Sequence, residues 1–152
     1  MSKRLFAAAI MVAVVLLSAC TNTQPEPTPT PSPTPDAFAR LQNEIAAYAG
    51  AEATEESGAL LVTLTISGAD KAQAATAFFE QAELICVNAL RDTEYTEVSF
   101  TMSVNDEDVG AFFIMLREAS MVAMPPMAYD PDYAEALEDA FMSSGFAYGE
   151  EW

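Results

Sequence analysis

Histidine is absent from the 152-residue sequence, and its absence excludes several kinds of chemistry. Histidine is the most common general base, a frequent metal ligand and the side chain that titrates near neutral pH. A Ser-His-Asp triad is therefore impossible. The sequence also has no glycine-rich phosphate-binding loop, and Ser143-Ser144-Gly145 does not match a nucleophile elbow. These absences predict that the protein is not an enzyme.

Positive charge is scarce as well. The chain has 6 Lys and Arg against 23 Asp and Glu, which gives a net charge of −17 at pH 7. Such a surface repels the phosphates of nucleic acids and anionic lipid head groups. Nucleic acid is therefore excluded as a partner, and basic partners or cations are favoured.

Long apolar runs and cysteines are few. The longest N-terminal apolar run, Leu5 to Leu17, is shorter than the roughly 20 residues that a transmembrane helix needs. Lys3 and Arg4 precede this run, and small residues and Cys20 follow it. A positive start, an apolar middle and a small-residue end are typical of an export signal.

The Leu17-Ser18-Ala19-Cys20 ending resembles the lipobox of bacterial lipoproteins. The resemblance implies that residues 1–19 are removed as a signal peptide and that Cys20 carries diacylglycerol, whose two acyl chains are fatty acids such as palmitate. Two acyl chains give stable anchoring where one chain is marginal. The expected location is therefore the cell membrane, with the protein lipid-anchored and facing outside the cytoplasm. Cys86 is then left without a cysteine partner within the chain, so no intramolecular disulfide is expected.

Residues 20–35 are expected to form the lipidated cysteine and a Pro/Thr-rich tether. Prolines occupy every second position from Pro25 to Pro35. Because proline fixes its own φ and disfavours helix for the preceding residue, the tether should be extended polyproline II, roughly 45 Å long at about 3.1 Å per residue. A spacer is the simplest interpretation, and a glycosylated segment or a proline-rich binding motif is the alternative.

Residues 36–152 are expected to form a single acidic globular domain, since about 117 residues can bury a sizeable core. Apolar periodicity, caps and turn residues predict, in chain order, a helix from Asp36 to about Gly50, a strand over 59–67, a helix from Asp70 to about Leu90, strands over 98–104 and 109–116 around a turn at 105–108, and a helix from Asp130-Pro131 to Gly145. The run 109–116 is also compatible with a buried helix. Between these elements we expect a polar connection over 51–58, an irregular segment over 121–129 and a short edge strand over 146–148.

This α-β-α-β-β-α order predicts an α+β fold with a small antiparallel sheet and helices on one face. The order is reminiscent of ferredoxin-like split βαβ domains. That analogy rests on element order alone and carries no function.

The most specific candidate site is the methionine motif Met121, Met124 and Met127. Three thioethers at a spacing of three resemble the methionine motifs of copper-handling proteins, and thioether is a soft ligand that selects Cu(I). Methionine also fills irregular gaps in cores and makes adaptable binding surfaces. Packing or a partner-contact surface is therefore the competing interpretation.

Two acidic clusters are weaker candidates. Residues 105–108 lack the ligand spacing of an EF-hand loop and are interpreted as a solvated turn. Glu135 with Glu138 or Asp139 would lie on one helix surface, whereas glycosidic chemistry needs two carboxylates facing each other across a cleft. Neither cluster favours a metal site or an active site.

The sequence thus predicts a membrane-anchored extracytoplasmic lipoprotein with a non-catalytic binding domain. Its expected partners are the membrane, through the lipid on Cys20, and a cell-envelope protein or basic ligand. No cofactor is expected apart from the covalent diacylglycerol. The alternatives are a Cu(I)-handling lipoprotein that uses the methionine motif and a cell-envelope enzyme that uses carboxylates.

Overall fold

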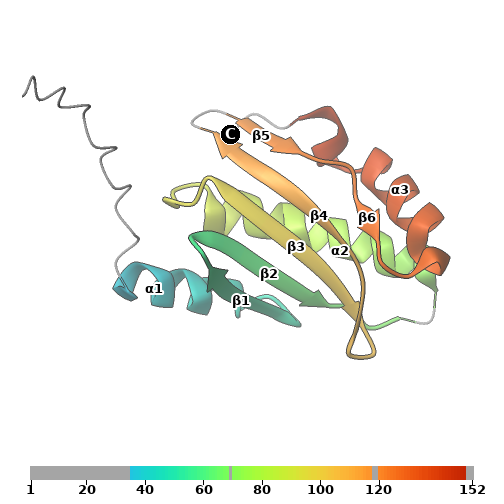
Figure 1. The fold of residues 1–152 in the computed structure, drawn as a ribbon, viewed down its shortest axis with the longest axis horizontal. Helices are drawn as coiled ribbons and strands as arrows, with labels where there is room; N and C mark the ends of the chain where they lie inside the picture. Colours follow the sequence, from blue (N-terminus) through green and yellow to red (C-terminus); the bar gives the residue numbers. More distant parts are fainter. Residues whose placement is uncertain (1–34, 69, 118–119, 150–152) are drawn as a thin grey trace, which may run out of the picture. The chain divides into compact units, whose positions relative to one another are not determined.

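A six-stranded sheet runs through the part of the chain that the computed structural model describes, residues 35–68, 70–117 and 120–149 (Figure 1). These residues lie in one compact unit of the chain, residues 32–152. The expected signal peptide, Cys20 and most of the tether lie outside the described residues. In chain order the elements are α1 (Pro35–Ile45), β1 (Ala51–Glu56), β2 (Ala59–Thr65), α2 (Lys71–Ile85), the π-helix η1 (Cys86–Leu90), β3 (Glu97–Val104), β4 (Glu107–Arg117), β5 (Ser120–Ala123), β6 (Met127–Ala128), the 3-10 helix η2 (Pro131–Tyr133), α3 (Ala134–Ser143) and the 3-10 helix η3 (Gly145–Tyr148).

The strand order β1-β2-β3-β4-β5, with β6 also paired to β4, defines an α+β fold. This confirms the predicted class. The sheet is mixed, however, because β2 and β3 are parallel neighbours joined by α2, whereas all other pairs are antiparallel. A strand–helix–strand connection brings the chain back to the end of the sheet where it began, so the two strands run in the same direction. No strand separates β2 from β3, so the split βαβ order of ferredoxin-like domains is not present.

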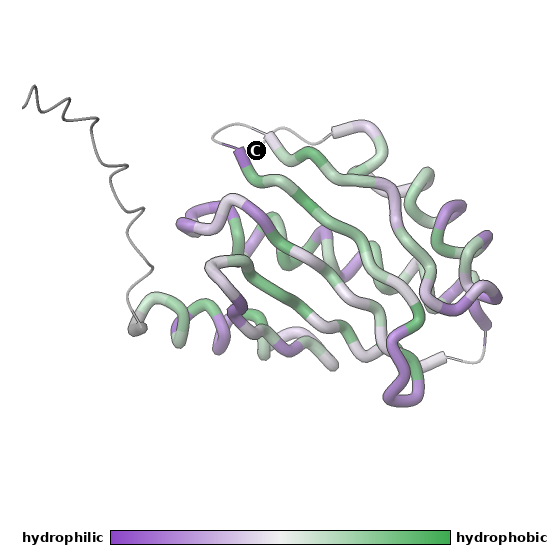
Figure 2. The backbone as a smooth tube through the Cα atoms, in the orientation of Figure 1, coloured by the Kyte–Doolittle hydropathy of each residue, from purple (hydrophilic) through white to green (hydrophobic). Residues whose placement is uncertain are grey.

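The β3–β4 hairpin forms where the sequence predicted it. Asn105 and Asp106 at its turn have φ values of 52° and 65°, which these two residue types tolerate better than most. Figure 2 shows this turn as a hydrophilic tip beyond the apolar middle of β4. The run 109–116 is therefore strand rather than buried helix.

Helix α2 begins at the predicted cap, where the Asp70 side chain accepts a hydrogen bond of 3.0 Å from the backbone N–H of Gln73. The helix carries Phe78 and Phe79 into the core. Its last turn widens into the π-helix η1, which contains the buried Cys86. The predicted helix to Leu90 is thus helical over its full length but changes type at Cys86.

The centre of the core is an aromatic cluster around Phe112 of β4. Its ring centroid lies 5.4 Å from that of Phe100 on β3, and 5.5 and 4.9 Å from those of Phe78 and Phe79 on α2. Phe146 of η3 lies 5.1 Å away. A fully buried phenylalanine contributes roughly 1.5–3 kcal/mol, so this cluster holds α2 and η3 on the same face of the sheet.

The polar connection expected over 51–58 is instead strand β1 and a turn. Ala51 and Ala53 point into the core, and Glu52 between them is exposed. Alanine and glutamate are uncommon in strands. Because only two small side chains of this edge strand are buried, its sequence shows little of the apolar alternation that predicts a strand. Pairing with β2 therefore determines this strand more than its own sequence does.

The C-terminal part also differs from expectation. The segment 121–129 is not irregular throughout, because β5 and β6 both pair with β4 and only residues 124–126 separate them. The edge strand expected over 146–148 is instead part of the 3-10 helix η3, and Gly145, where the last helix was expected to end, does not have a positive φ. The predicted start of the last helix is correct: Asp130 accepts a hydrogen bond of 2.9 Å from the N–H of Asp132, and a 3-10 turn leads into α3.

Candidate functional site

One face of the sheet is covered by helices and the other is not. In Figure 1 the strands lie in front of α2, and none of the described helices crosses the near face. Alternate residues of β2, β3 and β4, including Val62, Phe100 and Phe112, are buried beneath the helices. The residues between them point to the opposite side, which we call the outer face.

Five apolar side chains gather on the outer face at β4, β5 and β6, and we call them the outer patch: Phe113, Met115, Val122, Met124 and Met127. The strand register places them together, since Met115 pairs with Val122 and Ala111 pairs with Met127. The N–H of Met124 donates a hydrogen bond of 2.8 Å to the carbonyl of Phe113. Met124 and Met127 are 49% and 62% exposed.

Both edges of the sheet are obstructed. At the β1 edge, the side-chain amide of Gln42 on α1 donates a hydrogen bond of 2.9 Å to the carbonyl of Ala53. At the other edge, Pro125 and Pro126 have no backbone N–H groups to donate to a further strand, and η3 packs against β5. Proline and covering elements are devices that discourage the addition of a further strand. The outer face is therefore better suited than either edge to contact another molecule.

Acidic side chains border the outer patch. Glu97 lies directly opposite Met115 in the β3–β4 pairing, and Asp108 lies beyond the other end of the patch, opposite Ser103. Glu52 belongs to the same face but lies on β1, three strands away from β4. Arg117 pairs with Ser120 at the end of β4, two residues beyond Met115, so one basic side chain also lies on this face. With the charge of the whole chain at −17, the patch lies in a negative field.

The three methionines of the predicted copper motif are not on one surface. Met121 pairs with Leu116 on the helix-covered side and is 2% exposed, whereas Met124 and Met127 belong to the outer patch. Sequence reasoning therefore found Met124 and Met127 of the patch and missed Phe113 and Val122. The alternation of Phe113 and Met115 with buried neighbours was hidden in a continuous apolar run.

The carboxylates of the two acidic clusters occupy surface positions. Glu135, Glu138 and Asp139 are exposed on α3, and residues 105–108 form the hairpin turn. Within residues 35–68, 70–117 and 120–149, no group of three His, Cys, Asp or Glu is arranged to hold a metal ion. None of the helices in these same ranges is long and apolar enough to cross a membrane.

A cavity of about 410 Å³ lies between α1 and the segment 88–95. The buried Tyr95 lines it and donates a hydrogen bond of 2.7 Å from its hydroxyl to Oε2 of Glu55 on β1. Burial, and secondly this hydrogen bond, raise the pKa of Tyr95 well above its ordinary value. The contact joins the loop before β3 to the edge strand, so we interpret Tyr95 as a structural group.

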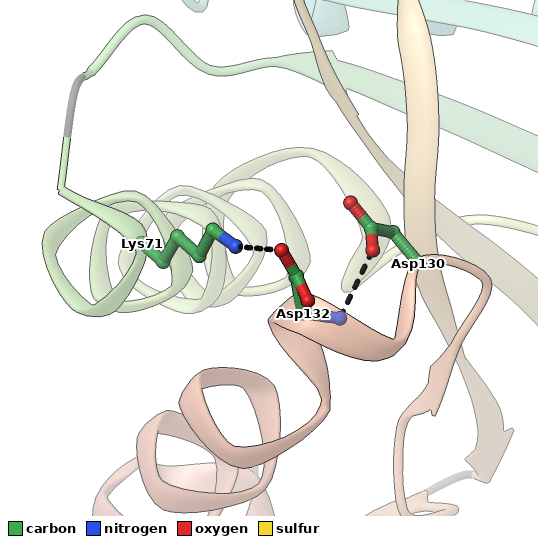
Figure 3. Close-up of polar contacts among 3 residues, drawn as sticks. All are labelled: Lys71, Asp130 and Asp132. Atoms are coloured by element: carbon green, nitrogen blue, oxygen red, sulfur yellow. Dashed lines mark hydrogen bonds and ion pairs between the residues drawn. The ribbon is translucent and has the colours of Figure 1, made fainter.

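A polar junction joins the starts of α2 and of the last helix (Figure 3). Nζ of Lys71 lies 2.8 Å from Oδ2 of Asp132 and 5.1 Å from the ring centroid of Tyr133. The hydrogen bond between the two charged groups raises the pKa of Lys71 and lowers that of Asp132. Both side chains are accessible to solvent, so the junction orients two helices and does not form a binding pocket.

Comparison with protein-family models, with curated proteins and with solved structures gives no match for this chain.

Proposed function

We propose that the protein is a lipid-anchored extracytoplasmic lipoprotein whose domain binds another cell-envelope protein through the outer patch. The single observation that carries the binding role is the cluster of apolar side chains on an uncovered sheet face, of which Val122, Met124 and Met127 are exposed. Contiguous exposed apolar surface with a polar border is typical of protein interaction sites.

The chemistry of the outer patch suits a protein partner. Methionine side chains are unbranched and polarizable, so they adapt to the shape of an opposing surface. Met124 and Met127 are about half exposed, and burying the remaining area would contribute roughly 1 kcal/mol each. The obstructed sheet edges direct the contact to the face of the sheet.

The anchor rests on the order of residues at the N-terminus. The sequence from Lys3 to Cys20 has the layout of a lipoprotein signal, and the Pro/Thr-rich segment after it would hold the domain away from the membrane. Metabolic labelling with a fatty acid tests this part directly. We expect the native protein to incorporate the label and to sediment with membranes, and Cys20→Ala to lose both the label and the cleavage before residue 20. Full processing and membrane retention of the Cys20→Ala variant would contradict the anchor.

The binding role is tested by a photoreactive amino acid placed at Met127 in living cells. Met142 provides the matched control, because it is 55% exposed but lies on α3 in the helix layer. We expect a discrete crosslinked protein, identified by mass spectrometry, from position 127 and not from position 142. Val122→Ser in the same chain should reduce the crosslink. Equal crosslinking from both methionines, or none at position 127, would contradict the proposed binding surface.

A further inference from the structure

The shape and charge of the outer patch indicate which kind of partner segment fits it. We infer that the patch binds a cationic amphipathic helix of its partner, with the apolar stripe of that helix on the methionines and its Lys or Arg side chains toward the acidic border. This inference rests on the proposed function and specifies the chemistry of the partner.

The first reason is the secondary structure of the segment. An extended strand would have to pair with a sheet edge, and both edges are obstructed, by Gln42 at β1 and by Pro125-Pro126 between β5 and β6. A helix satisfies its own backbone hydrogen bonds and needs only an apolar surface to pack on. The opposite face of this sheet is already covered in that way by α2 (Figure 1).

The second reason is size. Strands lie roughly 4.8 Å apart and a helix with side chains is roughly 10–12 Å wide, so one helix covers two to three strands. The outer patch occupies β4 and the β5–β6 edge, with β3 beside them. Along β4 it extends from the Ala111–Met127 pair to the Met115–Val122 pair, which is roughly 14 Å at 3.4 Å per residue. A helical segment of about nine residues, at 1.5 Å each, covers this length.

The third reason is charge. Glu97 and Asp108 lie on the outer face near the two ends of the patch. The whole chain has 23 acidic and 6 basic residues. An acidic segment, or a second copy of this chain, would meet like charge, whereas Lys and Arg flanking an apolar stripe would be attracted. Charge complementarity therefore favours a basic partner over self-association.

The test uses the processed chain, residues 20–152, with Cys20 replaced by Ala so that it carries no lipid. The probe is a fluorescent synthetic helix of 16 residues with a Leu/Phe stripe and Lys at the remaining positions. Its controls are a peptide of the same composition in scrambled order and a peptide with Glu in place of Lys. We expect binding of the amphipathic Lys peptide only, with at least tenfold weaker binding in 0.5 M than in 0.05 M salt.

Variants then locate the binding. We expect Met124→Ser with Met127→Ser to weaken binding at least tenfold, Glu97→Gln to weaken it about threefold, and Met142→Ser to change it less than twofold. Circular dichroism confirms that each variant is folded. Equal binding of the scrambled peptide, or an equal loss in the Met142→Ser variant, would overturn the inference. The inference would also be overturned if the native chain formed a dimer in sedimentation experiments and the double variant Met124→Ser, Met127→Ser did not. In that case a second copy of the chain would cover the patch.

The two proposals fail in different ways. If the crosslink from Met127 in cells persists but the helical probe does not bind, the binding surface stands and the cationic helix is wrong. If position 127 gives no crosslink, the proposed function itself fails, whatever the peptide does.

Discussion

Gly110 of β4 lies so close to Leu137 of α3 that a Cβ atom on the glycine would be 2.5 Å from Cδ1 of Leu137. The same position would be 3.0 Å from the carbonyl oxygen of Met127. Gly110 also pairs with Ala128, so the absence of a side chain lets α3 and β6 approach β4 together. One glycine thus determines the position of the segment that carries part of the outer patch.

Gly110→Ala should destabilise the domain by about 1–3 kcal/mol, the usual effect of overpacking a core. Urea unfolding monitored by circular dichroism measures this difference. Gly68→Ala is the matched control, because its Cβ would have only Ala74 within 4 Å, at 3.9 Å. Because Met127 would be displaced, Gly110→Ala should also weaken binding at the outer patch. Equal stability of the two variants would show that α3 can shift without cost.

Tyr95 makes the stability of the domain depend on pH in the alkaline range. Because burial and the hydrogen bond to Glu55 raise its pKa above the unfolded value near 10, the folded state retains a proton that the unfolded state loses. Its contribution is complete below pH 10 and declines as the pH rises above that value. Tyr95→Phe should therefore remove part of the alkaline loss of stability.

Thermal unfolding at pH 7 and between pH 9 and 11 measures this effect. At pH 7 we expect Tyr95→Phe to cost about 1 kcal/mol, the usual net value of one hydrogen bond. Tyr148→Phe is the control, because Tyr148 is 81% exposed and should leave the pH profile unchanged. If the Tyr95→Phe variant loses as much stability between pH 9 and 11 as the native protein does, the structural role of this tyrosine is contradicted.

The Lys71–Asp132 junction predicts a second pH dependence, at the acidic end. The pKa of Asp132 is lowered, so its contribution is present above the unfolded value near 4 and is lost as the pH falls through the folded value. Asp132→Asn should lower the melting temperature slightly at pH 7, and this difference should vanish in high salt and in acid, once the carboxyl group is protonated in the folded state as well. Asp139→Asn on the same helical segment is the control. A difference that persists in high salt would show that the contact is not mainly ionic.

Local elements of the fold were predictable where one residue pattern determined them. Asp70 capped α2, alternation defined β2 and β3, and the Asn105-Asp106 turn defined the hairpin. The parallel pairing of β2 with β3 and the existence of β1 were not predictable in this way. Both depend on which strands meet after folding, and the Ala/Glu sequence of β1 carries no strong strand signal.

The candidate site was only partly predictable for a similar reason. A spacing of three in an irregular loop allows Met121 and Met124 to converge, but in a strand successive side chains alternate and residues three apart point to opposite faces. Because residues 120–123 form β5, Met121 enters the core and Met124 remains outside. Pairing with β4 then adds Phe113 and Met115, which are adjacent in space but not in sequence.

The same alternation gives a prediction about copper. A Cu(I) site on this motif needs three converging sulfurs, but Met121 is 2% exposed on the helix-covered side while Met124 and Met127 lie on the outer face. We therefore expect Met124→Leu to leave Cu(I) binding unchanged in competition with a chromophoric chelator. Met121→Leu should also leave it unchanged and should alter stability by less than about 1.5 kcal/mol, because the swap nearly conserves volume. If the protein bound Cu(I) one to one and each of the two substitutions abolished this binding, β5 would have to leave the sheet to bring the sulfurs together. That result would support a copper-handling role.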